Sequence, residues 1–368
     1  MLSKGSQKAG DNSNQVYIEN QTVGITESRA TEIARIQAEI AIREKFTAEA
    51  EVKASSRIQH ADRKIIAKLT ALELLDIFGE PSFLSAFQKA QISAAQSDRE
   101  TDYDVLANLL VERAVSNANV AKAAVVRAIE VVDLVDDEAL AGLTALWFVG
   151  TTTANASTPE VALETLEASY ASILSGSLPV GTWWIDHLSA LNLVRVDRTL
   201  RFKSYIDLFL KDRPAWACVG LTSDEVVEHS DRLKSLIGMG VDPSIFISHP
   251  YNEERFVFVF NSKSDAVEAI RGYFEGVGKS LDGVDWPAVG EFFEFLDKVD
   301  DSCVENLKNY IRENYPNVAR VMAWWGSFGQ YADTTHIGAA LAFTNAKRFD
   351  DLKGLSSLED MLISYGMG

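Results

Sequence analysis

One pattern dominates residues 29–149 and limits what the chain can fold into: apolar residues recur every three or four positions, which is the spacing of one helix face. The pattern is interrupted only by short breaks such as GEP at 79–81. Its segments are rich in good helix formers, as in TALELLDIF, SFLSAFQKAQISAAQ, DYDVLANLLVERAV and ANVAKAAVVRAIEVVDLV. This half of the chain therefore predicts a helical domain.

The second half begins after the linker GTTTANAST at 150–158 and has a mixed character. Thr158, Pro159 and Glu160 form a strong helix start, with a capping hydroxyl, a proline at the first helical position and an acid in the first turn. Beyond residue 180, LVRVDRTLRF at 193–202 predicts two short strands about a turn, and IFISHPYNEERFVFVF at 245–260 predicts a hairpin. The last hundred residues predict helices again.

We therefore expect a mainly α protein of the α+β class. The expected division is a β assembly segment, a helical domain, a winged-helix-like mixed region and a C-terminal helical region, at 1–28, 29–150, 151–280 and 281–368.

The N-terminal stretch GDNSNQVYIENQTVGITES at 10–28 differs from everything that follows, because apolar and polar residues alternate in it. Period two is typical of a strand. An isolated hairpin is marginal in water, and an unpaired edge with apolar side chains attracts partners. We expect this strand to pair with copies of itself and so to build a homo-oligomer through five residues, Val16, Tyr17, Ile18, Val23 and Ile25. Open-ended cross-β stacking and a disordered tail are the alternatives.

Two further features concern packing. The tryptophan pairs Trp183–Trp184 and Trp324–Trp325 predict that one ring of each pair enters a core while its neighbour meets another element. Gly338, Ala342 and Ala346 are spaced four apart, so they predict a helix face poor in side chains that another element can approach closely.

The charge distribution bears on partners. The net charge of −18 opposes wholesale binding to a polyanion. Residues 29–68 are nonetheless locally basic, with nine Lys and Arg residues against six Asp and Glu residues. This stretch predicts a solvated helix face or a docking surface for an acidic partner, including a sister subunit.

A second candidate site lies between 159 and 203. Helix, helix, strand, turn and strand is the order of a winged-helix unit, and four cations cluster on the expected wing: Arg195, Arg198, Arg201 and Lys203. Such a cluster could contact nucleic-acid phosphates. The expected recognition helix TWWIDHLSALN carries no Arg or Lys, which favours a structural or protein-docking role instead.

No pattern of catalytic or metal-binding residues stands out. GYFEGVGKS at 272–280 resembles a phosphate-binding loop, but Tyr273 replaces the required glycine and a helix precedes it, so we expect a helix C-terminus. DLVDD at 133–137 and DKVDD at 297–301 lie where one helix ends and the next begins, and predict helix caps. The histidines are spread without a paired spacing: His60, His187, His229, His249 and His336. We expect no catalytic residue, metal or cofactor.

The cysteines and the apolar runs indicate a compartment. Cys218 and Cys303 are isolated, which fits a reducing cytosol. The longest apolar run, ALAGLTALWFV at 139–149, is too short to cross a bilayer, and no signal peptide is evident. We expect a cytoplasmic protein without a membrane span.

Two segments, TTHIGAALAFTNAKRF at 334–349 and GEPSFLSAFQKAQISAAQSDRETDYDVLANLLVERA at 79–114, resemble a family of uncharacterised bacterial proteins. Its members open with a Gly/Asp/Asn/Ser/Gln strand segment, continue with a helical body and close on a T-x-x-G…N-x-K-R helix. The chain departs from that pattern at Glu80, where the family has Asp, and by continuing well past Arg348. The resemblance implies a bacterial cytosolic protein with an anti-phage defence association and carries over no catalytic residue.

These observations predict a self-assembling cytosolic scaffold or sensor protein, and the resemblance implies a bacterial protein with a role in anti-phage defence. The alternative is a winged-helix nucleic-acid-binding protein, and an enzyme of unrecognised type comes third.

Overall fold

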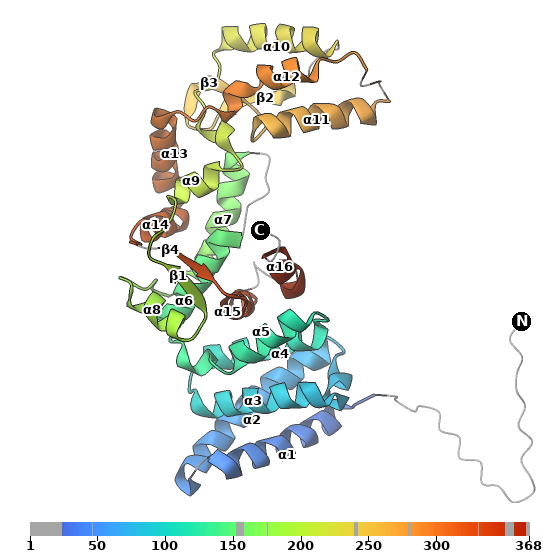
Figure 1. Ribbon diagram of the computed structural model, residues 1–368, viewed down its shortest axis with the longest axis vertical. Helices are drawn as coiled ribbons and strands as arrows, with labels where there is room; N and C mark the ends of the chain where they lie inside the picture. Colours follow the sequence, from blue (N-terminus) through green and yellow to red (C-terminus); the bar gives the residue numbers. More distant parts are fainter. Residues whose placement is uncertain are drawn as a thin grey trace, which may run out of the picture.

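The computed structural model of the chain describes residues 24–45, 47–151, 158–174, 176–238, 242–278, 280, 282–329, 331–349 and 357–365. Within these residues the fold is mainly α, as predicted, with sixteen α-helices and two small two-stranded sheets. Figure 1 shows an elongated molecule with α1 to α5 at one end and α10 to α12 at the other.

The end that contains the chain's first helices is a layered helical unit (Figure 1). Its helices are α1 (Glu27–Lys45), α2 (Ala48–Ala71), α3 (Pro81–Gln96), α4 (Glu100–Val115) and α5 (Asn119–Ile129). Short 3-10 helices at Leu75–Gly79 and Val132–Leu134 follow α2 and α5. Buried alanines on α3, such as Ala86, Ala90 and Ala94, allow its neighbours to approach closely.

The middle of the molecule joins segments that lie far apart in the sequence. It contains α6 (Asp137–Thr151), α7 (Pro159–Ile173), α8 (Trp183–Ala190), α9 (Tyr205–Leu210), α13 (Asp301–Asn314), α14 (Pro316–Trp325), α15 (His336–Ala346) and α16 (Leu358–Tyr365). Helix α15 packs against α4, α5 and α6, so the C-terminal part of the chain returns to the N-terminal half. One continuous apolar core runs from Ala30 to Leu362.

The far end is built around the hairpin β2 (Phe246–His249) and β3 (Asn252–Phe258), which confirms the hairpin predicted at 245–260. Its helices are α10 (Ser223–Ile237), α11 (Lys263–Gly276) and α12 (Trp286–Phe292), with 3-10 helices at Pro214–Ala217, Pro243–Ile245 and Glu294–Asp297. A second apolar core, centred on Phe258 and Phe293, holds this end together. The predicted domain boundaries at 28, 150 and 280 stay predictions.

The predicted wing does not form as expected. Strand β1 (Val194–Asp197) is present, but residues 200–203 are not a strand, and β1 pairs antiparallel with β4 (Tyr331–Thr334). Asp197 accepts hydrogen bonds from the N–H groups of Thr199 and Leu200, which turns the chain away from β1. Strand β1 therefore pairs with residues 331–334, which belong to a region for which the sequence predicts helices.

The predicted aromatic and capping contacts are largely present. Trp184 is fully buried and stacks on Trp324 at 5.8 Å, whereas Trp183 is half exposed. Trp325 is also buried, so the second pair enters the core with both rings. Thr158 caps α7 as predicted. In the two Asp-rich turns, Asp136 accepts from the Ala139 N–H and Asp300 caps α13.

Helix α15 approaches the backbone before β1 very closely at Gly338. A Cβ atom placed there would lie 1.9 Å from the Leu193 carbonyl oxygen. The Thr335 hydroxyl donates to the Asn192 carbonyl at 2.7 Å, and the Thr335 N–H donates to Leu193 at 3.0 Å. These bonds hold the start of α15 against the residues that precede β1, so the small-residue face predicted at Gly338, Ala342 and Ala346 is confirmed as a packing face.

We expect Gly338→Ala to lower the free energy of unfolding by about 3 kcal/mol, because the added methyl group must displace backbone. Chemical denaturation monitored by circular dichroism measures the effect. The control is Gly272→Ala in α11, where an added Cβ meets nothing within 4 Å. That change should be neutral or slightly stabilising, and equal losses for the two variants would contradict this account of Gly338.

Candidate functional site

A groove of about 770 Å³ lies between α1 and α2 at the outer end of the molecule. Its walls come from residues 27–42 of α1 and residues 55–67 of α2. Small side chains such as Ala34, Ala38 and Ala67 leave the space between the helices open. The volume is within the range of ligand-binding clefts, and most of the surface along the floor is apolar.

Three carboxylates line this groove, and one of them, Asp62, is buried, with only 8% of its surface exposed. The Gln91 side chain on α3 donates from Nε2 to both Asp62 oxygens, at 3.2 and 3.0 Å, and to the Ala34 carbonyl at 3.0 Å. Gln91 Oε1 is buried without a hydrogen-bond partner among the described residues. Gln91 on α3 therefore links Asp62 on α2 to the Ala34 carbonyl on α1, and these groups form a small polar cluster where the three helices pack together.

The electrostatics of Asp62 are unusual for a surface helix. Burial raises the pKa of its carboxyl to about 7, and the Gln91 hydrogen bond only partly offsets that effect. Arg35 forms an ion pair with Glu39, and Arg63 donates from Nε to the Gln59 carbonyl at 3.3 Å. Both arginines of the groove thus have other partners, and no ion pair to Asp62 is present in the described part of the chain. Asp62 can gain or lose a proton near neutral pH.

Sequence reasoning did not single out Asp62 or Gln91. A signal was present: Asp62 interrupts the buried stripe of Ile58, Ile65 and Leu69 at helical spacing. A charged residue at a core-facing position is uncommon and marks a site for inspection.

The outer face of α1 is partly apolar. Ala30 and Ala34 bury the helix against the core, and Ile33 packs at its edge. Ile36 and Ile40 remain 40% and 42% exposed. Ile33, Ile36 and Ile40 thus form an apolar stripe at helical spacing that is only partly covered within one chain.

Of the predicted assembly residues, Val16, Tyr17, Ile18 and Val23 lie outside the described residues. Ile25 lies in the loop before α1 and not in a strand. Its N–H donates to Asp76 Oδ1 at 2.6 Å, and its side chain packs on the main core. Assembly through these residues stays a prediction.

The four predicted wing cations are all exposed around β1 and the loop after it. Arg195 lies opposite Asp333 in the β1–β4 register, and Arg201 donates to the Gly329 carbonyl at 3.0 Å. Many cations of the basic stretch 29–68, in contrast, are already paired: Arg29 with Glu32, Arg35 with Glu39, Arg57 with Asp98, and Lys64 with Glu100 and Asp104.

The histidines occupy separate positions. His60 meets Glu100, His187 the Leu134 carbonyl, and His229 the Glu225 carbonyl, while His336 is the first residue of α15. No group of three or more His, Cys, Asp and Glu side chains among the described residues is placed to hold a metal ion. Gly278 ends α11 in the left-handed region, as expected for GYFEGVGKS.

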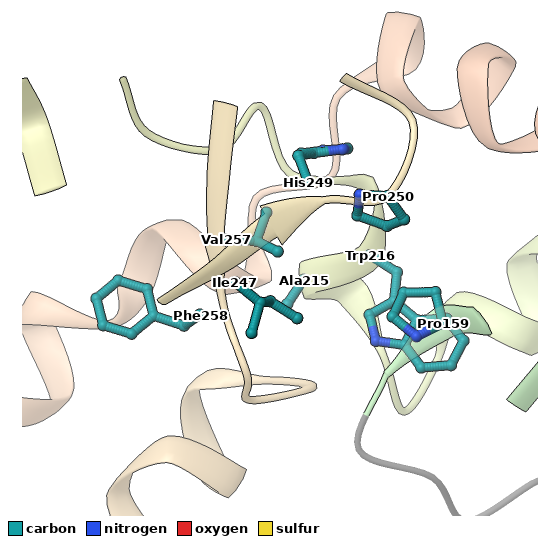
Figure 2. Close-up of a pocket in the computed structure, with 8 residues that line it drawn as sticks. All are labelled: Pro159, Ala215, Trp216, Ile247, His249, Pro250, Val257 and Phe258. Atoms are coloured by element: carbon teal, nitrogen blue, oxygen red, sulfur yellow. The ribbon is translucent and has the colours of Figure 1, made fainter. Parts of the chain in front are cut away.

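A second hollow, drawn in Figure 2, lies beneath the β2–β3 hairpin next to Pro159 and Trp216. His249 lies beside it, with Nε2 donating to the Cys218 carbonyl at 3.2 Å, and burial lowers the pKa of the imidazole. The cavity measures about 10 Å³, which is room for roughly one water molecule. Burial also raises the pKa of the Cys218 thiol, so it is a poor nucleophile.

The chain was also compared with known proteins. A protein-family model described as ":-like" matches residues 24–356. The chain belongs to this family. The match includes the segments at 79–114 and 334–349 on which the bacterial resemblance rests, and the description names no activity, ligand or partner. No curated protein and no solved structure matches the chain.

In the part of the chain that the structure describes, no helix is both long and apolar enough to cross a membrane.

The raised pKa of Asp62 makes a prediction about stability. The folded state binds a proton at this group more tightly than the unfolded state does, so ionisation destabilises the fold increasingly from pH 4 to pH 7. Asp62→Asn removes that cost and should raise the free energy of unfolding at pH 8 by up to about 4 kcal/mol, with little change at pH 4. Thermal unfolding at both pH values measures it. A variant that is equally or less stable at pH 8 would contradict this assignment.

Proposed function

We propose that the chain is a self-assembling scaffold or sensor protein whose subunits associate at the end formed by α1 and the segment before it. The observation that supports this most is the partly exposed apolar pair Ile36 and Ile40 on the outermost helix. Adjacent apolar side chains at the tip of an elongated molecule favour contact with another chain.

The segment before α1 adds to this argument. It carries the alternating pattern with Val16, Ile18 and Val23 and joins the described chain next to Ile25, which Asp76 anchors at the start of α1. An exposed strand edge has unpaired backbone N–H and C=O groups that can pair with another chain. Contacts through this segment and through α1 would bring several subunits together around one end.

We further propose a bacterial, cytoplasmic protein with a role in anti-phage defence. The two cysteines are free and buried, which agrees with a reducing compartment. The defence role rests on the family resemblance alone.

The mass in solution tests assembly. We expect full-length protein to be oligomeric, and a variant lacking residues 1–23 to have a lower mass by light scattering. The deletion retains the Ile25–Asp76 contact, so the fold should persist. Ile36→Lys combined with Ile40→Lys should weaken assembly as well, whereas Val227→Lys, at an exposed apolar position on α10, should not. Full-length and truncated proteins of equal oligomeric state would overturn the N-terminal segment as the assembly element.

Nucleic-acid binding is the second candidate. It is favoured by the side chains of Arg195, Arg198 and Lys203, which are exposed and form no ion pair with a carboxylate of the described chain. Few phosphate contacts in an acidic protein imply weak binding with a shallow salt dependence.

We expect weak duplex binding at ~50 mM salt and about tenfold weaker binding when Arg195, Arg198 and Arg201 are replaced by Ala. Fluorescence anisotropy measures both affinities. Replacing the exposed Arg29, Arg127 and Arg312 by Ala changes the net charge equally and should have less effect. Equal affinity for the two triple variants, or no binding by any protein, would remove this function.

A further inference from the structure

We propose that the groove between α1 and α2 binds an organic amine, with the ammonium group on Asp62 and the apolar body along Ala34, Ala38, Ile66 and Ala67. The inference rests on the proposed sensor role and names the class of molecule that such a sensor would detect.

The shape of the groove supports a small molecule. Its volume of about 770 Å³ accommodates a ligand of drug size. The lining combines a mostly apolar floor with one buried carboxylate and a few polar side chains, including Thr31, Ser55 and Gln59. That combination of apolar surface and few polar groups is typical of ligand sites.

The negative charge of the Asp62 carboxylate favours a positively charged ligand. An ionised carboxylate removed from water is costly unless a cation accompanies it. The groups that face Asp62 are the Gln91 amide from α3, the charged side chains Glu27, Arg35 and Glu39 along α1, and Arg63 on its own helix. Arg35 and Arg63 bond elsewhere, so an ammonium group would supply the missing positive charge.

The small side chains explain why the ligand needs an apolar part. Ala34, Ala38 and Ala67 present methyl groups, and Ile66 a larger apolar side chain, toward the groove. Covering them with hydrocarbon removes apolar surface from water, at roughly 25 cal/mol per Å². A fully hydrated inorganic cation would gain nothing from this surface.

Proton linkage follows from the same geometry. An amine is already protonated at neutral pH, so its binding must ionise Asp62 and release a proton when that group is neutral. With a pKa of about 7, roughly one tenth of Asp62 is ionised at pH 6 and roughly nine tenths at pH 8. The affinity of the wild type should therefore rise about tenfold between these pH values.

Hexylamine is the probe, and hexanol is its uncharged control. Saturation-transfer NMR titrations at pH 6 and pH 8 give the two affinities. We expect hexylamine to bind the wild type at pH 8 more tightly than hexanol does, and about tenfold more tightly than it binds Asp62→Asn. The pH dependence should vanish in that variant, which we expect to be at least as stable as the wild type. Glu268→Gln on α11 removes an equal charge outside the groove and should bind like the wild type.

Three results would overturn the inference: no hexylamine binding, equal binding of hexylamine and hexanol, or equal affinity in the wild type and Asp62→Asn. The assembly proposal is tested separately by light scattering on the deletion variant. Amine binding without assembly, or assembly without amine binding, would show which of the two proposals fails.

Discussion

The packing of α15 is the constraint on which the rest of the structure depends. Gly338 allows the helix to touch the Leu193 backbone, and Thr335 fixes that contact with two hydrogen bonds. At the other end of the helix, Asn345 donates to Thr144 at 2.9 Å and Lys347 pairs with the almost fully buried Glu112 at 2.7 Å. A buried ion pair is tolerated only when its partners are both in place. Helix α15 therefore connects the N-terminal helices to the mixed region, and the two ends of the molecule lie on either side of it.

The consequence is a molecule with a tightly packed middle and two ends of different character. The end with the β2–β3 hairpin has its own aromatic core, in which Phe258 contacts Phe292 and Phe293 edge to face. At the opposite end, buried alanines pack between the helices. Helix α1 there has apolar residues on its outer side and a groove on the side that faces α2. This end combines a groove, a buried carboxylate that forms no ion pair among the described residues, and two partly exposed isoleucines on α1. We therefore propose both association and ligand binding at this end.

The proposals on α1 are physically separable. Ile36 and Ile40 lie outside the groove, whose α1 wall includes Ala34 and Ala38. A subunit contact through the isoleucines would leave Asp62 accessible, whereas a contact that covers the groove would compete with the amine. A sensor requires the ligand to bind the states unequally, so the effect of the amine on the oligomeric mass would show how the two surfaces are coupled.

The sequence by itself determined the local features. Helical periodicity identified most helices, Thr158 and the Asp-rich turns marked helix starts, residues 245–260 formed the predicted hairpin, and the stripe at Gly338, Ala342 and Ala346 identified the packing face of α15. These features depend on neighbours within a few residues. Only the tertiary structure decided that β1 pairs with β4 and not with residues 200–203, and that Asp62 meets Gln91 beside an open groove. Both depend on contacts between residues far apart in the chain, and a local pattern does not show which distant residues come together.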